Sequence, residues 1–185
     1  MMESIVNFLN EVDMLTKIPR SGYAFLGSGK QSVAEHPLNT IAIGYALAHL
    51  YGDGVDEAKL LKLCVFHDLP ESRVGDHNYV QKRYVSANME NVFTDIGDSS
   101  PLGAEVVSYI EEFERKESLE AKLARDADNI EMLLMLKREI ETGNPRGQEW
   151  YNNVKSRVVT EVGKNLAEEI ATTPSDAWWK KYVIH

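Results

Sequence analysis

The sequence predicts an all-α protein that forms a single helical bundle. Apolar residues recur at three- and four-residue spacings through most of the chain, which is the period of an amphipathic helix. No segment shows the two-residue alternation typical of a strand, and no repeat, low-complexity tract or linker interrupts the chain. The 185 residues are 43% hydrophobic, which is enough for one compact core. We therefore expect one domain over residues 1–185.

The first helix is predicted over residues 5–15, where apolar side chains form a stripe at helical spacing. Pro19 ends it, because proline cannot donate a helical hydrogen bond. Residues 20–31 contain three glycines among polar and aromatic residues, and we expect them to form a loop.

A second helix is predicted to begin at Ser32 and to end at Gly52. Ser32 and Glu35 have the spacing of a capping box, in which each side chain binds the other residue's backbone N–H. Pro37 would then fall at the fifth helical position and remove a backbone hydrogen bond. Either the helix begins later than Ser32, or its first turn is distorted.

A third helix is predicted from Asp56 to Pro70. It is apolar on more than one face, so we expect it to be the central and most buried helix. Cys64 is expected to be part of this core, because a buried thiol without an activating partner is inert.

The second half of the chain also has helical patterns. A helical piece is expected at about residues 80–93, and a strong helix at residues 118–142, closed by Gly-Asn-Pro. The C-terminal helices belong to residues 146–185, with two helices over residues 147–172. The tryptophans at 178–179 are expected to pack a short last segment onto the body.

The composition excludes several functions. A net charge of −9 argues against a nucleic acid polymer as partner, because such binding needs clustered lysine and arginine. No apolar run approaches the ~20 residues that cross a bilayer. The acidic N-terminus has no features of a secretory signal, and a single cysteine cannot form an internal disulfide. We therefore expect a cytoplasmic protein with no membrane partner.

A metal site is predicted around His67 and Asp68, which stand together at the end of the apolar third helix. A buried charge without a partner is costly, so this carboxylate needs a cation, an ion pair or solvent. His36 upstream and Asp126 or Asp128 downstream can complete a set of nitrogen and oxygen ligands from three helices. Such a mixed set suits Mn²⁺, Co²⁺, Fe²⁺ or Mg²⁺. Any one of these residues alone is explained as well by a hydrogen-bonded polar group in the core, and periodicity does not decide between the last two.

In this order the residues resemble the HD-domain metal-dependent phosphohydrolases, and the flanking sequence is similar to their 5′-deoxynucleotidase-like branch. The segments that carry the resemblance, within core motifs spanning residues 18–142, are Arg20, Ser32 to His36, His67 to Glu71, Gly75-Asp76 and Ala127-Asp128. The resemblance implies a single HD-domain helical bundle. It also implies one divalent metal ion bound by His36, His67, Asp68 and Asp128, and it selects Asp128 over Asp126, which becomes a supporting or surface carboxylate.

Three further residues are candidates for the chemistry. The resemblance implies that Glu71 and Asp76 are catalytic, and two carboxylates beside a metal can position water and protonate a leaving oxygen. Arg20 is expected to bind phosphate with its guanidinium fork. A solvated helix end is the alternative for Glu71, and a surface salt bridge is the alternative for Arg20.

The resemblance implies a phosphohydrolase that removes phosphate from (deoxy)nucleoside 5′-monophosphates by means of a metal-activated water. One alternative is an HD hydrolase that acts on a nucleoside triphosphate, a (p)ppGpp-like signal or a cyclic nucleotide. Another is a catalytically silent metal-binding interaction module, although such a module needs no water-activating pair. Nothing in composition or spacing selects a base or a sugar. Related single-domain proteins often form homodimers. The aromatic C-terminal region, with Trp178, Trp179 and Tyr182, is compatible with a homodimer and equally with packing within one chain.

Overall fold

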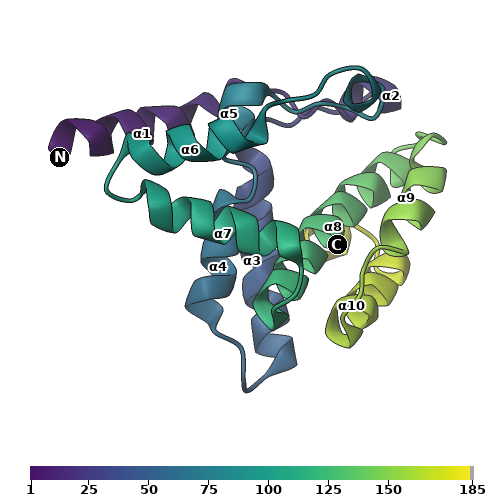
Figure 1. Cartoon of the computed structure of the whole chain (residues 1–185). Coiled ribbons are helices and arrows are strands. Elements are labelled where there is room, and N and C mark those ends of the chain that lie inside the picture. The colour runs from purple at the N-terminus through teal and green to yellow at the C-terminus, as the bar shows by residue number, and fades with distance from the viewer. Residues whose placement is uncertain (184–185) are drawn as a thin grey trace.

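The computed structural model describes residues 1–183, and in this range it is a bundle of helices (Figure 1). The only extended pairing there is an isolated bridge between Pro19 and Ser32, so the all-α prediction is confirmed. No helix within this range has both the length and the apolar character needed to cross a membrane. The longer helices in chain order are α1 (Met2–Met14), α3 (Glu35–Tyr51), α4 (Glu57–Phe66), α6 (Met89–Ser99), α7 (Gly103–Arg115), α8 (Leu119–Glu141), α9 (Gly147–Lys155) and α10 (Glu161–Thr172). The short ones are α2 (Tyr23–Leu26), α5 (Glu71–Val74), the 3₁₀ turn η1 (Gln81–Arg83) and α11 (Ala177–Lys180).

The central helix is α8, which packs against α3, α4, α7, α9 and α10. It buries twelve residues, whereas α4 buries three, so the expectation that the third helix would be the most buried is wrong. The reason lies in the neighbours of each helix. On α4, Lys59 and Lys62 form ion pairs near the surface. On α8, alanines such as Ala124 and Ala127 are fully buried, and their small side chains let the surrounding helices approach closely.

A smaller apolar cluster joins α1, α6 and α7 and contains Phe8, Ile96 and Ile110. It lies at the end of the molecule where α1, α5 and α6 come together, with α7 crossing beside them (Figure 1). The larger cluster surrounds α8, α3 and α4. Val33 and Leu69 belong to the smaller cluster, and each lies within three residues of a predicted metal ligand. The predicted ligands therefore lie near the boundary between the two clusters.

The start of α3 resolves the conflict that Pro37 posed. The capping-box hydrogen bonds form: Ser32 N–H donates to Glu35 Oε2 at 2.6 Å, and Glu35 N–H donates to Ser32 Oγ at 3.3 Å. The helix itself begins only at Glu35, so Pro37 is its third residue. Backbone N–H groups in the first turn have no partner within the helix, and proline therefore loses no hydrogen bond there. His36 is held in this rigid first turn, and it is fully buried.

Residues 76–116 differ most from the prediction. The helical piece expected at about 80–93 is only partly present: residues 81–83 form a 3₁₀ turn, and α6 begins at Met89 and continues to Ser99. Its N-cap Asn88 accepts a hydrogen bond from Asn91 N–H at 3.1 Å. Asparagine is a strong N-cap, and its position fixes where the helix starts. The sequence pattern also missed α7. Its first residue is Gly103, where a Cβ would lie 2.2 Å from the carbonyl oxygen of Ile96.

The other predicted helices are found where they were expected. Helices α1 and α8 match residues 5–15 and 118–142, and α9 and α10 are the two helices expected over 147–172. Residues 20–31 form the predicted loop except for the four residues of α2. The last segment is different: Trp178 is 73% exposed and Trp179 is 42% exposed, so the expected packing onto the body is wrong.

Candidate metal centre

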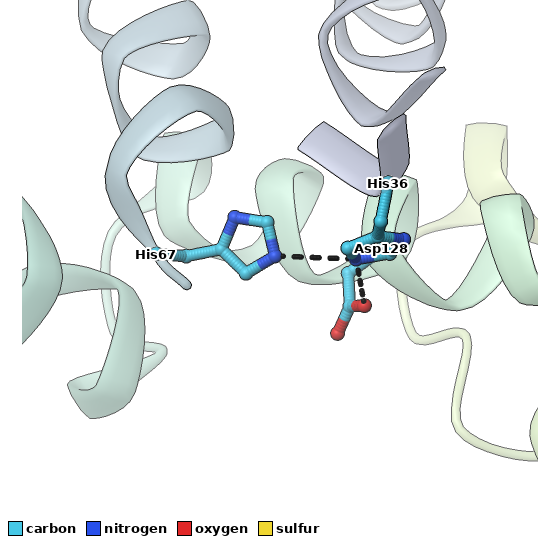
Figure 2. A group of neighbouring side chains, drawn as sticks. All are labelled: His36, His67 and Asp128. Atoms are coloured by element: carbon cyan, nitrogen blue, oxygen red, sulfur yellow. Dashed lines mark hydrogen bonds and ion pairs between the residues drawn. The ribbon is translucent and has the colours of Figure 1, made fainter. Parts of the chain in front are cut away.

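Three side chains from three helices meet at one point (Figure 2). His36 comes from the first turn of α3, His67 from the C-terminal end of α4, and Asp128 from the middle of α8. The two histidine Nε2 atoms lie 3.3 Å apart, and His36 Nε2 lies 3.1 Å from Asp128 Oδ1. One ligand atom from each residue falls within 4.8 Å of the others. This is the spatial arrangement that a shared cation requires.

The outer nitrogens of both rings are already engaged. His67 Nδ1 lies 3.0 Å from the carbonyl oxygen of Cys64, and His36 Nδ1 lies 2.8 Å from Glu131 Oε2. Both contacts require an N–H at Nδ1, so in the neutral rings the two Nε2 lone pairs face each other. Facing lone pairs beside a carboxylate repel unless a positive charge lies among them. The donor set therefore fits a divalent cation held by nitrogen and oxygen ligands.

The pKa values of His36 and Asp128 also indicate that this cluster favours a positive charge. Burial and the nearby Arg20 lower the pKa of His36, but hydrogen bonds with Asp128 and Glu131 outweigh them and raise it to about 9. Burial raises the pKa of Asp128, yet the contact with His36 lowers it to about 2. The cluster therefore holds a proton on His36 at neutral pH when no metal competes for it.

Asp68 borders this group. Its Oδ2 lies 3.4 Å from His67 Nε2 and 3.7 Å from His36 Nε2, and it accepts a hydrogen bond from Arg20 Nη1 at 3.3 Å. Burial raises the pKa of Asp68, but the two histidines and Arg20 hold it well below its usual range. The carboxylate is thus ionised and within reach of the same point. Its role as a fourth ligand stays a prediction.

Asp126 points away from the site. Its Oδ1 accepts a hydrogen bond from Val159 N–H at 2.8 Å, and its Oδ2 accepts from the backbone N–H and the hydroxyl of Thr160 at 2.8 and 2.6 Å. These groups lie in the turn that starts α10. Of the two aspartates that periodicity could not separate, the structure brings Asp128 to the histidines and uses Asp126 as an anchor for α10.

Two residues that hold the cluster had no predicted role. Glu131, buried on α8, accepts from His36 and also from Gln31 Nε2 at 2.7 Å. Arg125 Nη1 donates to Asp128 Oδ2 at 3.3 Å, and its guanidinium carbon lies 4.9 Å from the ring centre of Phe113. Both residues stand three positions from Asp128 on the same helix. That spacing was the available signal, because such residues share a helix face.

Glu71 and Asp76 line the pocket beside this cluster. The Oε2 atom of Glu71 is buried and has no hydrogen-bond partner among residues 1–183. Burial, together with the charges of Asp68 and Asp76, raises the pKa of Glu71 to about 8. Asp76 Oδ2 accepts a hydrogen bond from Ser21 N–H at 2.7 Å. A carboxyl group that carries a proton at neutral pH therefore lies near the ionised carboxylate of Asp68.

The pocket has a volume of about 250 Å³ and extends well beyond the predicted ligands. Arg20, Lys82 and Arg125 supply positive charge to its wall. Phe25, Tyr79 and Trp150 also line it, and no sequence pattern had linked these three aromatic residues. The seven predicted site residues lie in or directly beneath this pocket. They are Arg20, His36, His67, Asp68, Glu71, Asp76 and Asp128.

The fold and the site together define a helical protein with a histidine–carboxylate cluster of the kind that can hold a metal ion, bordered by a partly buried carboxyl group and an arginine. Residues 12–171 match the model of the HD domain, and the chain therefore belongs to the HD-domain family. The family that the sequence motifs resemble is thus confirmed.

Named relatives are similar in sequence, and solved structures share the fold. The chain is 26% identical to 5′-deoxynucleotidase HDDC2 of Danio rerio, over 92% of this chain and 90% of the relative. It is 30% identical to 5′-deoxynucleotidase HDDC2 of Dictyostelium discoideum, over 72% and 76%. The fold is shared with a conserved hypothetical protein from Pyrococcus furiosus (TM-score 0.79, 23% identity, 91% of this chain and 99% of that chain). It is also shared with a "predicted metal-dependent phosphohydrolase" from Magnetospirillum magnetotacticum (TM-score 0.71, 20% identity, 92% and 90%).

Proposed function

We propose that this chain, a hydrolase of the HD-domain family, removes the phosphate group from (deoxy)nucleoside 5′-monophosphates. The names of its relatives support a nucleotide substrate. The observation that carries the proposal is Glu71, whose Oε2 atom is buried and has no hydrogen-bond partner in the described part of the chain, in the same pocket as Arg20 and Asp128. A protein that only bound a metal would gain nothing from such a costly group.

The metal would be held by His36, His67, Asp68 and Asp128, with Mn²⁺, Co²⁺, Fe²⁺ or Mg²⁺ as candidates. When bound, a divalent ion lowers the pKa of a water molecule and polarises a phosphoryl oxygen. Glu131 and the carbonyl of Cys64 keep both histidine Nε2 lone pairs available by binding the opposite ring nitrogens.

Arg20 would hold the substrate phosphate. Its guanidinium has five N–H groups, and the hydrogen bond to Asp68 uses one of them. The remaining donors can bind two phosphate oxygens at once, which fixes the phosphorus atom as well as its charge. The contact with Asp68 links the phosphate-binding group directly to the metal-binding group, so the two would move as a unit.

Glu71 would act as the general acid of the reaction. When water attacks the phosphorus and the ester bond breaks, the 5′-oxygen of the nucleoside leaves and needs a proton. A carboxyl group with a pKa near 8 carries that proton at neutral pH and can donate it. Asp76 supports this state because its charge is one cause of the raised pKa, and Ser21 N–H holds it in place.

The test is to purify the protein, measure its bound metal, and assay phosphate release from nucleoside mono-, di-, tri- and cyclic phosphates with Mn²⁺, Co²⁺ and Mg²⁺. Monophosphates should be the best substrates. Asp68→Ala should lose both metal and turnover, whereas Glu71→Gln should keep the metal and lose rate. Release of phosphate from no nucleotide under any metal would overturn the proposal in favour of a metal-binding module. Preference for a triphosphate or a cyclic nucleotide would redirect it.

A further inference from the structure

Three aromatic rings from distant parts of the chain converge at the pocket. Phe25 comes from α2, Tyr79 from the segment after α5, and Trp150 from α9. The ring centre of Trp150 lies 6.3 Å from that of Phe25 and 6.2 Å from that of Tyr79, the latter in an edge-to-face arrangement. Phe25 is 39% exposed and Tyr79 is 58% exposed. These rings therefore form an aromatic corner, Phe25–Tyr79–Trp150, that is open to solvent.

The aromatic corner lies beyond the metal-type cluster along the same hollow. A second depression continues from the pocket and shares Tyr79, Trp150, Met132 and Arg157 with it. None of the predicted metal ligands lines this second depression. The pocket thus has a charged end and an aromatic end.

Three consecutive residues connect the two ends. Arg20 donates to Asp68, Ser21 N–H donates to Asp76, and the backbone of Gly22 lies against Trp150. A Cβ at Gly22 would be 3.5 Å from the Trp150 ring. Two peptide units span at most about 7 Å, so the backbone segment that carries Arg20 also borders the aromatic corner.

Hydrogen-bonding groups lie beside the rings. Arg157 Nη2 donates to the hydroxyl of Tyr79 at 3.0 Å and to Asn153 Oδ1 at 2.5 Å. Within residues 1–183 this guanidinium has no carboxylate partner. It orients the Tyr79 ring and offers further donors at the edge of the aromatic corner. An apolar ring with polar atoms on its rim fits such a surface.

We propose that Trp150, with Phe25 and Tyr79, forms the surface on which the base of the substrate stacks, so that the substrate is a nucleotide and a base-free sugar phosphate is a poor substitute. The inference rests on the proposed function, because the phosphate-binding end fixes the direction in which the substrate lies. Every base has a flat π face, and stacking on a protein aromatic ring is sequence-tolerant. The corner therefore favours nucleotides as a class, and Trp150 determines specificity for them.

Binding without turnover tests the stacking directly. The double variant Trp178→Phe/Trp179→Phe leaves Trp150 as the only tryptophan, because the chain has three, and both replaced residues lie outside the pocket. In this variant, with metal removed by EDTA, thymidine 5′-monophosphate should quench the tryptophan fluorescence saturably. 2-Deoxyribose 5-phosphate at the same concentrations should not. Equal quenching by both compounds, or by neither, overturns the proposal.

Kinetics separate stacking from packing. Trp150→Leu should reduce kcat/KM at least tenfold for thymidine 5′-monophosphate and leave that for 2-deoxyribose 5-phosphate within threefold, whereas Trp150→Phe should stay close to wild type on both. A parallel loss on both substrates means that Trp150 only supports the fold, and it overturns the proposal.

A matched pair of tyrosine variants keeps the proposal testable if the Trp150 variants fail to fold. Tyr79→Leu should raise KM for the nucleotide severalfold, and Tyr84→Leu should not, although both side chains are exposed and lie on the same segment. Equal effects from the two overturn the proposal. If fluorescence quenching is base-dependent but no phosphate is released, the base site stands and the proposed hydrolysis fails. If phosphate is released without base-dependent quenching, the proposed hydrolysis stands and the base site fails.

Discussion

The two faces of α8 use an aspartate in opposite ways. Asp126 faces the start of α10, and both its oxygens accept hydrogen bonds from backbone or hydroxyl groups there. Asp128 faces the two histidines, and its neighbours are His36 and Arg125, which hold it at a shared point. Asp126 is a carboxylate whose hydrogen-bonding needs are met within the fold. Asp128, like Glu71 across the pocket, is placed where an additional ligand completes its surroundings. We infer that the difference separates a structural carboxylate from a functional one, and the following predictions test it.

The largest expected effect comes from replacing each of these two aspartates with asparagine in separate variants. Asp128→Asn should lose bound metal and reduce turnover by about 10³-fold or more, since a neutral amide is a poor ligand for a hard cation. Asp126→Asn is the control: it should retain metal but lower the free energy of unfolding by about 2 kcal/mol, because it disrupts a charge-assisted helix anchor. Metal content, kcat and thermal unfolding check this, and equal metal loss in both variants would contradict the distinction.

Glu71 offers a second test, because its Oε2 atom has no hydrogen-bond partner among residues 1–183. Glu71→Gln should reduce kcat by about 10²- to 10⁴-fold, the usual contribution of a general acid, with metal content unchanged. A decrease of less than threefold would remove Glu71 from the reaction.

The same variant has a predicted effect on stability. Because the pKa of Glu71 is raised from 4.5 to about 8, the folded protein keeps a proton that the unfolded chain has lost. Stability of the metal-free protein therefore falls as pH rises from 4.5 through 8. Glu71→Gln should have a free energy of unfolding about 2 kcal/mol higher than wild type at about pH 9, and an equal one near pH 4. The difference at high pH is smaller than the full pKa shift would give, because the Glu71 side chain is partly exposed. Urea unfolding at the two pH values checks this.

Glu131 gives a smaller effect on the functional face of α8. Glu131→Gln removes the charge that orients His36 while keeping a side chain of the same shape. Metal affinity should fall by about 10- to 100-fold, the usual range for a residue that supports a histidine ligand. Competition with a fluorescent chelator measures it. Glu114→Gln, on the exposed surface of α7, removes the same charge and is the matched control that should leave the affinity unchanged.

The last expected effect needs no substitution: it is a pH dependence of metal binding. His36 has a pKa of about 9 in the metal-free protein, and metal binding must displace that proton. Apparent affinity should therefore rise with pH, by about tenfold per unit below 9, and level off above it. Titrations in two buffers of different ionisation enthalpy would count the released proton. If the metal affinity did not change between pH 7 and pH 9, His36 would not carry the proton that metal binding displaces.

The sequence was sufficient to predict the helices with strong periodicity and to single out two histidines at their ends that the structure brings together. His36 and His67 could be found because each stands at a helix terminus marked by a cap or a proline. The burial ranking of α4 and α8 could not be found, since periodicity reports the character of one helix and not what packs around it. The start of α6 is set by the N-cap at Asn88, a residue type that favours this position.

The rest of the site depends on contacts between segments far apart in the chain. The role of Asp126 is set by a turn more than thirty residues later, at Val159 and Thr160. The aromatic corner depends on α2, the segment after α5, and α9 coming together, and no local pattern encodes this. Glu131 and Arg125 could have been suspected from their spacing to Asp128, but only their hydrogen bonds assign them a partner.

The origin of the ligands in α3, α4 and α8 has a consequence for the dynamics of the whole bundle. A cation bound there cross-links three helices of the main core, much as a covalent bridge would. At a concentration one hundred times its dissociation constant, such a ligand stabilises the folded state by about 2.7 kcal/mol. Its removal should therefore speed amide hydrogen exchange throughout the central helices that share this core, while the outlying α1 changes less. Metal supply would then set how long the protein persists in its folded form as well as whether it is active.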